Sequence, residues 1–263
     1  MHQQLSKAPV TYVLAQVKFS SIENIASYIP QLQDEIRDLF PHYNILSIQA
    51  IELKNAQQPP DFTVLTQWHF IDKEKQMGII LDKQAIILHT NKHEKFQTLL
   101  SIFETIIARF NKVLKISLST RLGIRYINLI EHGLQKVNIG LRGFQLLNNG
   151  FKEDQFITNT ETTQFSQEGI IKIKSTLVKN KTVIGNTFNI FVPLDLVDTA
   201  KSLSFQHLTE PKNGFLMLDI DHFSDEQDDF DMANILNRFR QLQEGVYQAF
   251  CQSVEKENLK DWM

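Results

Sequence analysis

The chain has a single cysteine, Cys251, among 263 residues, so an internal disulfide is excluded. No apolar run approaches the roughly 20 residues that a membrane-spanning helix needs. The amino-terminal segment 1–7 also lacks the basic-then-apolar pattern of a signal peptide. These absences predict a soluble cytoplasmic protein with no membrane segment.

The chain also lacks an excess of charge of either sign. Its formal net charge is −3, and no basic domain or tail is present. Proteins that bind nucleic acid through electrostatics usually carry a basic face or stripe. We therefore do not expect nucleic acid to be a partner, although a local basic patch would be compatible with the composition.

Sequence signatures of common catalytic sites are missing as well. The chain contains no phosphate-binding G-x-x-x-x-G-K-[ST] loop, no G-x-G-x-x-G, no G-x-S-x-G elbow and no H-E-x-x-H pair. Its eight histidines are scattered, without an i, i+4 pair on a predicted helix. The sequence thus identifies no catalytic residues, no metal ligands and no cofactor.

What the sequence does have is an ordinary globular composition, with 42% apolar and 22% charged residues. Its 19 phenylalanines favour a sheet-rich core. Strand-like segments recur along the chain, joined by tight turns and short loops, and amphipathic helices are predicted over 96–110 and 229–259. Strands joined in this way form antiparallel sheets, so the sequence predicts an α+β fold.

The chain divides into two halves with a common plan, an antiparallel sheet followed by a long helix that covers it. The predicted boundary lies where a glycine-containing stretch begins, at 133–150. We therefore expect an N-terminal half, 1–132, and a C-terminal half, 133–263. The two halves either pack around a shared core or form one intimate domain.

Helix ends are predicted from local signals. Ser20-Ser21-Ile22-Glu23 matches a capping box at a helix start, and Pro30 should kink or split that helix near Tyr28. Asn91 is a candidate N-cap for the helix over 96–110. The last helix should bury one apolar stripe in the core. The stripe consists of Ile235, Phe239, Leu242, Val246, Phe250 and Val254.

The segment 117–130 predicts a long strand with apolar residues on both faces, as in an interior strand. Arg121 and Arg125 share one face of it. A buried guanidinium needs a partner, because an unpaired buried charge is costly. Guanidinium forks also suit planar anions, so a bound phosphate or carboxylate is the functional alternative.

A second polar group lies in the strand predicted near residue 218. Asp219 and Asp221 share one face, whereas His222 faces the other way, which argues against a metal site. One interpretation is that these carboxylates pair with Arg121 and Arg125 across the sheet. The other interpretation is that Arg121, Arg125, Asp219 and Asp221 together bind a small molecule or anion.

The acidic run 225–231 follows this strand and precedes the last helix. It lacks the glycine and the terminal glutamate of a calcium-binding loop at the required spacing. Negative charge before a helix start is favourable to the helix dipole. We interpret the run as a structural helix start.

The run Arg121-Leu122-Gly123-Ile124-Arg125-Tyr126-Ile127-Asn128 resembles the central signature of a sporadically distributed family of uncharacterised bacterial proteins of about this length. The opening strand, ending in Val17-Lys18-Phe19, is similar to that family's start, and Leu218-Asp219-Ile220-Asp221 is similar to its close. The resemblance covers essentially the whole chain. It implies a bacterial protein, and it brings no activity and no catalytic residues.

Two functions follow as expectations. The first is a non-catalytic binding or accessory component of a multi-protein system, with a protein partner of unknown identity. The alternative is a small-molecule or anion-binding protein, or a hydrolase, that uses Arg121, Arg125, Asp219 and Asp221 between the sheets. The sequence leaves enzymatic activity open and favours the first function, because it shows no assembled nucleophile and base.

Overall fold

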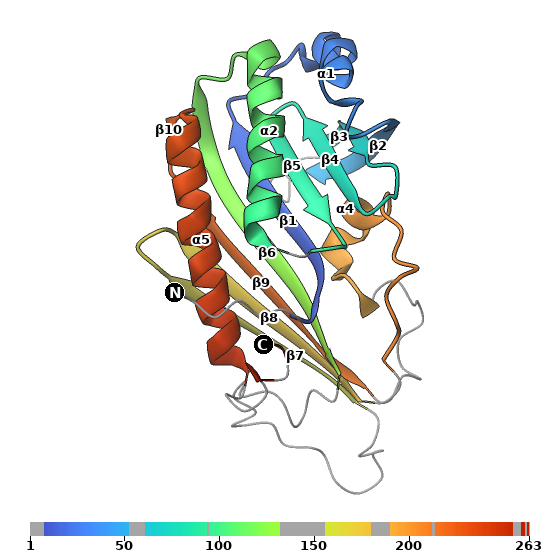
Figure 1. The fold of residues 1–263 in the computed structure, drawn as a ribbon, viewed down its shortest axis with the longest axis vertical. Helices are drawn as coiled ribbons and strands as arrows, with labels where there is room; N and C mark the ends of the chain where they lie inside the picture. Colours follow the sequence, from blue (N-terminus) through green and yellow to red (C-terminus); the bar gives the residue numbers. More distant parts are fainter. Residues whose placement is uncertain are drawn as a thin grey trace, which may run out of the picture.

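The described part of the protein is one large antiparallel sheet with long helices on one face (Figure 1). This is the predicted α+β fold. The computed structural model describes residues 8–52, 61–93, 95–131, 156–179, 190–211, 214–254, 259–260 and 262.

The sheet has ten strands in the order β2-β3-β4-β5-β1-β6-β9-β8-β7, and the short β10 pairs with β6. Neighbouring strands along the chain pair at both ends of this order, whereas β1 and β9 flank β6 at its centre. The strands are β1 (Val10–Phe19), β2 (His42–Glu52), β3 (Asp61–Ile71), β4 (Met77–Asp82), β5 (Ala85–Thr90), β6 (Leu118–Glu131), β7 (Phe156–Phe165), β8 (Ile170–Lys179), β9 (Phe215–Ser224) and β10 (Asp228–Asp229).

β6 joins the two halves of the sequence into one sheet. It pairs with β1 on one side and with β9 on the other, so that Arg125 lies opposite both Leu14 and Asp221. The predicted boundary at 132/133 lies outside the described residues, which break off after Glu131. The glycine-containing stretch 133–150 lies outside the described residues, so the division into halves stays a prediction.

One face of the sheet, called here the helix face, is covered by α2 (Phe96–Leu114) and α5 (Met232–Ser253) (Figure 1). The apolar sides of both helices pack with the strands in one large core. Burial of this kind, at about 25 cal/mol per Å² of apolar surface, is the main force that holds a helix on a sheet. The predicted stripe is buried at all six positions, of which Ile235, Phe239, Leu242, Val246 and Phe250 lie in α5. The sixth, Val254, is extended, so this helix ends at Ser253 and not near 259 as predicted.

Pro30 splits the first helix, as predicted. A 3-10 turn, η1 (Ile25–Tyr28), leads directly into α1 (Ile29–Ile36), whose first turn contains the proline. The predicted capping box of Ser20 and Glu23 is wrong, because the residue before the helical turn is Asn24, and the Glu23 carboxylate instead accepts from the Ser21 hydroxyl at 2.7 Å. The helical turn begins only after Asn24.

The predicted cap at Asn91 is also wrong, since α2 begins at Phe96 with Lys95 as its N-cap residue. Asn91 instead donates from Nδ2 to the backbone oxygen of Ser204 at 2.7 Å. A polar residue before a helix can bond to a distant segment as readily as to the helix itself. Here it ties the chain after residue 190 to the sheet.

The opposite face, called here the back face, is partly covered by residues 190–208, which contain η4 (Leu194–Leu196) and α4 (Val197–Ala200). Phe191 and Phe205 stack and pack beside Tyr12 of β1. The apolar pattern of 187–192 is typical of a strand, but residues 190–192 form a turn, and 187–189 lie outside the described residues. The apolar pattern there reflects burial against the sheet rather than strand pairing.

Among the described residues, no helix combines the length and the apolarity needed to cross a lipid bilayer.

Candidate functional site

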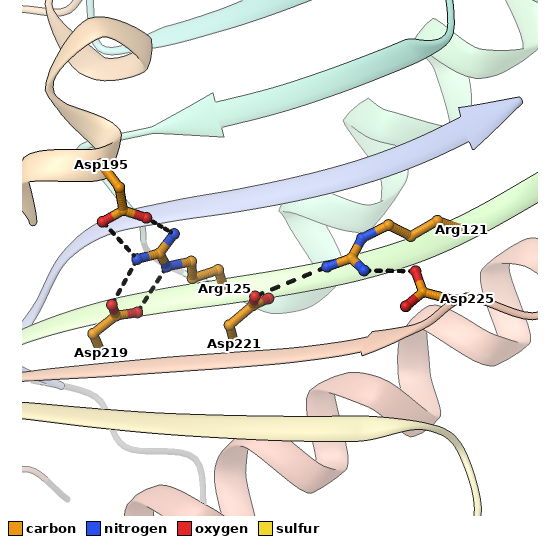
Figure 2. A network of polar contacts seen from close by, with 6 residues as sticks. All are labelled: Arg121, Arg125, Asp195, Asp219, Asp221 and Asp225. Carbon is orange, nitrogen blue, oxygen red and sulfur yellow. Dashed lines mark hydrogen bonds and ion pairs between the residues drawn. The ribbon is translucent and has the colours of Figure 1, made fainter. Parts of the chain in front are cut away.

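Arg125 lies on the back face of β6, where two carboxylates grip its guanidinium group (Figure 2). Asp219 of β9 accepts from Nε at 2.8 Å and from Nη2 at 2.7 Å. Asp195 of η4 accepts from Nη1 at 2.7 Å and from Nη2 at 3.2 Å. Paired contacts of this kind are stronger than single neutral hydrogen bonds. The predicted contact between Arg125 and a carboxylate is therefore present, and it is doubled.

The two carboxylates on Arg125 differ in their exposure to water. The Asp219 side chain is 4% exposed and that of Arg125 is 13% exposed, whereas Asp195 is 56% exposed. Burial raises the pKa of Asp219 against the opposing pull of Arg125. At Asp195 burial also pushes the pKa upward, but the bonds from Arg125 outweigh it and hold the pKa below its ordinary value. Asp219 is thus the buried partner of Arg125, and Asp195 is its partner at the surface.

Arg121 lies four residues earlier on the same face, and its contacts are looser. Its Nη1 is 2.6 Å from Asp225 Oδ1, and that carboxylate is 58% exposed. Its Nη2 is 4.0 Å from Asp221 Oδ2, which is an ion pair without a hydrogen bond. The guanidinium carbon lies 3.6 Å from the centre of the Phe223 ring, in a cation–π contact.

Asp221 has the weakest partners of the four predicted residues. Its only ion pair in the described part of the chain is the long one to Arg121. Lys172 of β8 lies opposite it in the sheet register and directs its Nζ to 5.7 Å from the centre of the Phe223 ring. Burial raises the pKa of the Asp221 carboxyl, and the nearby arginines offset only part of that rise.

The structure therefore brings Arg121, Arg125, Asp219 and Asp221 together on one face, in two adjoining groups (Figure 2). The sequence missed Asp195, because it lies 70 positions from Arg125 in a turn that has no recognisable signature. Three of the Arg125 nitrogens already donate to carboxylates. A bound anion would have to displace Asp195 first, so this geometry serves as a cross-link between β6, β9 and η4.

His222 faces away from these carboxylates, as the alternation along β9 predicts. Its Nδ1 lies 2.8 Å from the backbone oxygen of Leu242 in α5, and its Nε2 lies 3.0 Å from the hydroxyl of Ser166. It cannot join Asp219 and Asp221 in one coordination sphere. Within the described residues, no three histidine, cysteine or acidic side chains gather closely enough to hold a metal ion.

The acidic run 225–231 forms a helix start, in line with its interpretation from sequence. The Asp231 carboxylate accepts from the Asn234 amide at 2.8 Å and thereby caps α5. Asp228 accepts from the Asn234 side chain and lies 3.8 Å from Arg238.

Two histidines that the sequence did not single out are fully buried on the back face. His89 of β5 lies over Gly78 of β4, where a Cβ atom would collide with its ring. Its Nδ1 lies 2.9 Å from the Tyr12 hydroxyl. Burial lowers the pKa of His89 to about 3 and that of His69 to about 4, so both are neutral at physiological pH. They fill the core and carry no charge there.

Comparison of the chain with protein-family models, with curated proteins and with solved structures found no match. The resemblance to the sporadically distributed bacterial family therefore stays a prediction.

Proposed function

We propose that this protein is a binding component of a multi-protein assembly in the cytoplasm of a bacterial cell, and that it holds an extended strand of a partner protein along the edge of β7. The observation that carries the proposal is the condition of this edge. β7 pairs with β8 only, and its other side has no neighbour among the described strands.

The edge is long and regular, and no described strand covers it. β7 spans ten residues and follows β8 in unbroken register from Phe156 to Phe165. Sheet proteins usually blunt such an edge with a proline, a bulge or several charges. The described stretch has no proline and no bulge, and Glu161 is its one charged residue.

Side chains on both faces of β7 are available to a partner. Nearly all described side chains from Ile157 onward are exposed, and Phe165 at the end of the strand is 84% exposed. In strand addition the backbone provides hydrogen bonds and alternate side chains provide specificity. The threonine-rich sequence of β7 suits this role, since threonine is favoured in strands.

The Arg125 cross-link argues for this function over the anion-binding alternative. Four of its five N–H donors are bonded to Asp195 and Asp219, and these bonds tie residues 190–208 to the sheet. A sheet whose outer strand has no described neighbour can accept a partner strand, whereas a guanidinium that already holds two carboxylates is a poor anion receptor.

The hydrogen-bond pattern of the β7–β8 hairpin identifies the residues to change. The Ser166 amide donates to the Gly169 carbonyl at 2.7 Å, so 166 and 169 form a hydrogen-bonded pair. Such pairs alternate along an antiparallel ladder. The backbone groups of Phe165, Thr163 and Glu161 therefore point to the free edge.

The test is affinity capture from the native cell with the wild-type protein and with Thr163→Pro. Proline removes the outward amide while the bonds to β8 remain, so the partner should bind at least about tenfold more weakly, equivalent to about 1.4 kcal/mol. Thr163→Ala is the matched control and should bind as the wild type does. Equal capture by all three proteins would refute strand addition at β7, and a concentration-dependent dimer that Thr163→Pro abolishes would identify the partner as a second copy.

A further inference from the structure

Ser166 and His222 meet at the end of the β7–β8 hairpin, on the helix face of the sheet. Ser166 belongs to the turn between the two strands, and its side chain is exposed. Its Oγ lies 3.0 Å from Nε2 of His222. The other ring nitrogen, Nδ1, lies 2.8 Å from the backbone oxygen of Leu242 in α5. The Ser166 hydroxyl, the His222 imidazole and the Leu242 carbonyl oxygen thus form a chain of two hydrogen bonds.

The hydrogen bonds fix the tautomer of His222. A backbone carbonyl can only accept, so Nδ1 must carry the proton. Nε2 then holds a lone pair, and the Ser166 hydroxyl donates to it, with the Gly169 carbonyl at 3.1 Å as a second acceptor. A serine whose proton is directed at a neutral imidazole is the arrangement that activates a nucleophile.

The charge state of His222 is suited to a general base. Burial lowers its pKa, against smaller opposing effects of the Leu242 carbonyl and of Glu168. The ring is therefore neutral at pH 7 and able to take a proton. The Glu168 carboxylate in the same turn would favour the imidazolium that forms when it does.

Two glycines allow this arrangement to form. Gly245 lies within α5, where glycine is a poor helix former, and a Cβ atom there would collide with Nδ1 of His222. Gly169 has φ of +145°, and a Cβ atom there would collide with the backbone of Phe223. The first glycine lets the ring approach the helix, and the second lets the turn approach β9.

We propose that Ser166 is a nucleophile for acyl transfer from an ester substrate, with His222 as its general base. The Ser166 Oγ attacks the ester carbonyl carbon, and its proton passes to Nε2 of His222. The bond from that carbon to the leaving oxygen breaks, and this oxygen takes the proton from His222. Water, activated by the same nitrogen, then releases the acid and regenerates the serine hydroxyl.

This activity is independent of partner binding along β7, because the hydroxyl is exposed at the turn and does not use the strand edge. The sequence did not indicate it, since 56 positions separate the two residues and no local motif joins them. The rival role for the same contacts is a tether that fixes the hairpin turn to α5.

The direct test treats the full-length protein with a fluorophosphonate probe and locates the adduct by peptide mass spectrometry. Attack of Oγ on phosphorus expels fluoride, so an activated serine is labelled without the need for its natural substrate. The expected result is an adduct on Ser166 and none on Ser101, an exposed serine of α2. No adduct on Ser166, or equal labelling of Ser101, would leave only the tether.

Two variants test the base. His222→Gln should slow labelling of Ser166 by about 100-fold or more, which is the range for removal of a general base. Gly245→Ala is the second variant, because its methyl group displaces the ring while it favours the helix; it should slow labelling similarly in a folded protein. Labelling at the wild-type rate in a folded variant of either kind would overturn the role of His222.

Discussion

Arg125 and Arg121 lie four residues apart on the same face of the same strand, yet their contacts differ in number and in burial. Arg125 makes four hydrogen bonds to two carboxylates, one of which is nearly fully buried. Arg121 makes one short bond to an exposed carboxylate and rests on the Phe223 ring. The residue type is identical, so the difference comes from what the neighbouring elements place around each side chain.

The difference between the two arginines depends on residues 190–208, which partly cover the back face. Residues 190–208 pack on part of the back face and bring Asp195 onto Arg125 (Figure 2). Arg121 has one close carboxylate, Asp225 from the chain that follows β9, and a second at 4.0 Å, Asp221 of β9. A buried ion pair costs much when it is broken, whereas an exposed pair is worth little. The two arginines should therefore respond very differently to substitution.

The largest effect is expected for Arg125→Ala. The substitution leaves the Asp219 carboxylate buried without its partner, and breaking a buried pair costs roughly 3–5 kcal/mol. Urea denaturation at pH 7 measures this as a fall in the free energy of unfolding. A loss below about 1 kcal/mol would show that Asp219 reaches water.

Asp195→Asn should have an intermediate effect, a loss of about 1 kcal/mol at pH 7, because its exposed carboxylate is screened and Arg125 keeps Asp219. The pKa of Asp195 is held below its ordinary value, so its contribution is present at neutral pH and is lost as the pH falls through that lowered pKa. The difference from wild type should shrink below about pH 4. A penalty that stayed constant down to pH 3 would contradict this charge-based explanation.

Arg121→Ala should cost less than about 1 kcal/mol, since its close partner is exposed. The remaining loss comes from the contact of its guanidinium with the Phe223 ring. Arg121→Lys, which keeps the charge but not the planar group, separates the two contributions. Thermal melting of both variants beside Arg125→Ala would measure the contrast directly, and equal losses at the two arginines would remove it.

The smallest effect, and the one of opposite sign, is expected for Asp221→Asn. Burial raises the pKa of this carboxyl, so the folded protein holds its proton more tightly than the unfolded chain does. Stability therefore falls as the pH rises through the raised pKa, and a neutral side chain avoids that loss. We expect a gain of less than about 1 kcal/mol at pH 7, which disappears below about pH 4. Measurements of the unfolding free energy at pH 7 and pH 3.5 check both the sign and the trend.

Much of the candidate site was predictable because strand periodicity is a local property. Alternation along β6 and β9 placed Arg121, Arg125, Asp219 and Asp221 on common faces and turned His222 away from them. The pairing of the arginines with the aspartates then required only that the two strands be neighbours. The helical stripe of α5 was predictable for the same reason, since its spacing depends on nothing beyond the helix.

The starts of the helices and the structure of residues 190–192 were predicted poorly. Glu23 and Asn91 had the chemistry of capping residues, but each bonds elsewhere, because a polar side chain takes whichever partner the fold brings near. Residues 190–192 had the apolar pattern of a strand and became a buried turn. An apolar pattern indicates that a segment is buried, but it does not indicate which strand, if any, that segment pairs with.

The sequence by itself determined the α+β class, the faces of the central strands and the buried stripe of the last helix, because each follows from a repeat along the chain. Only the tertiary structure decided that Asp195 closes over Arg125, that Ser166 meets His222, and that β7 is the outermost described strand at its end of the sheet. Those contacts join residues tens of positions apart, and the free energy that selects them depends on all the surfaces that pack together. No local pattern contains that information.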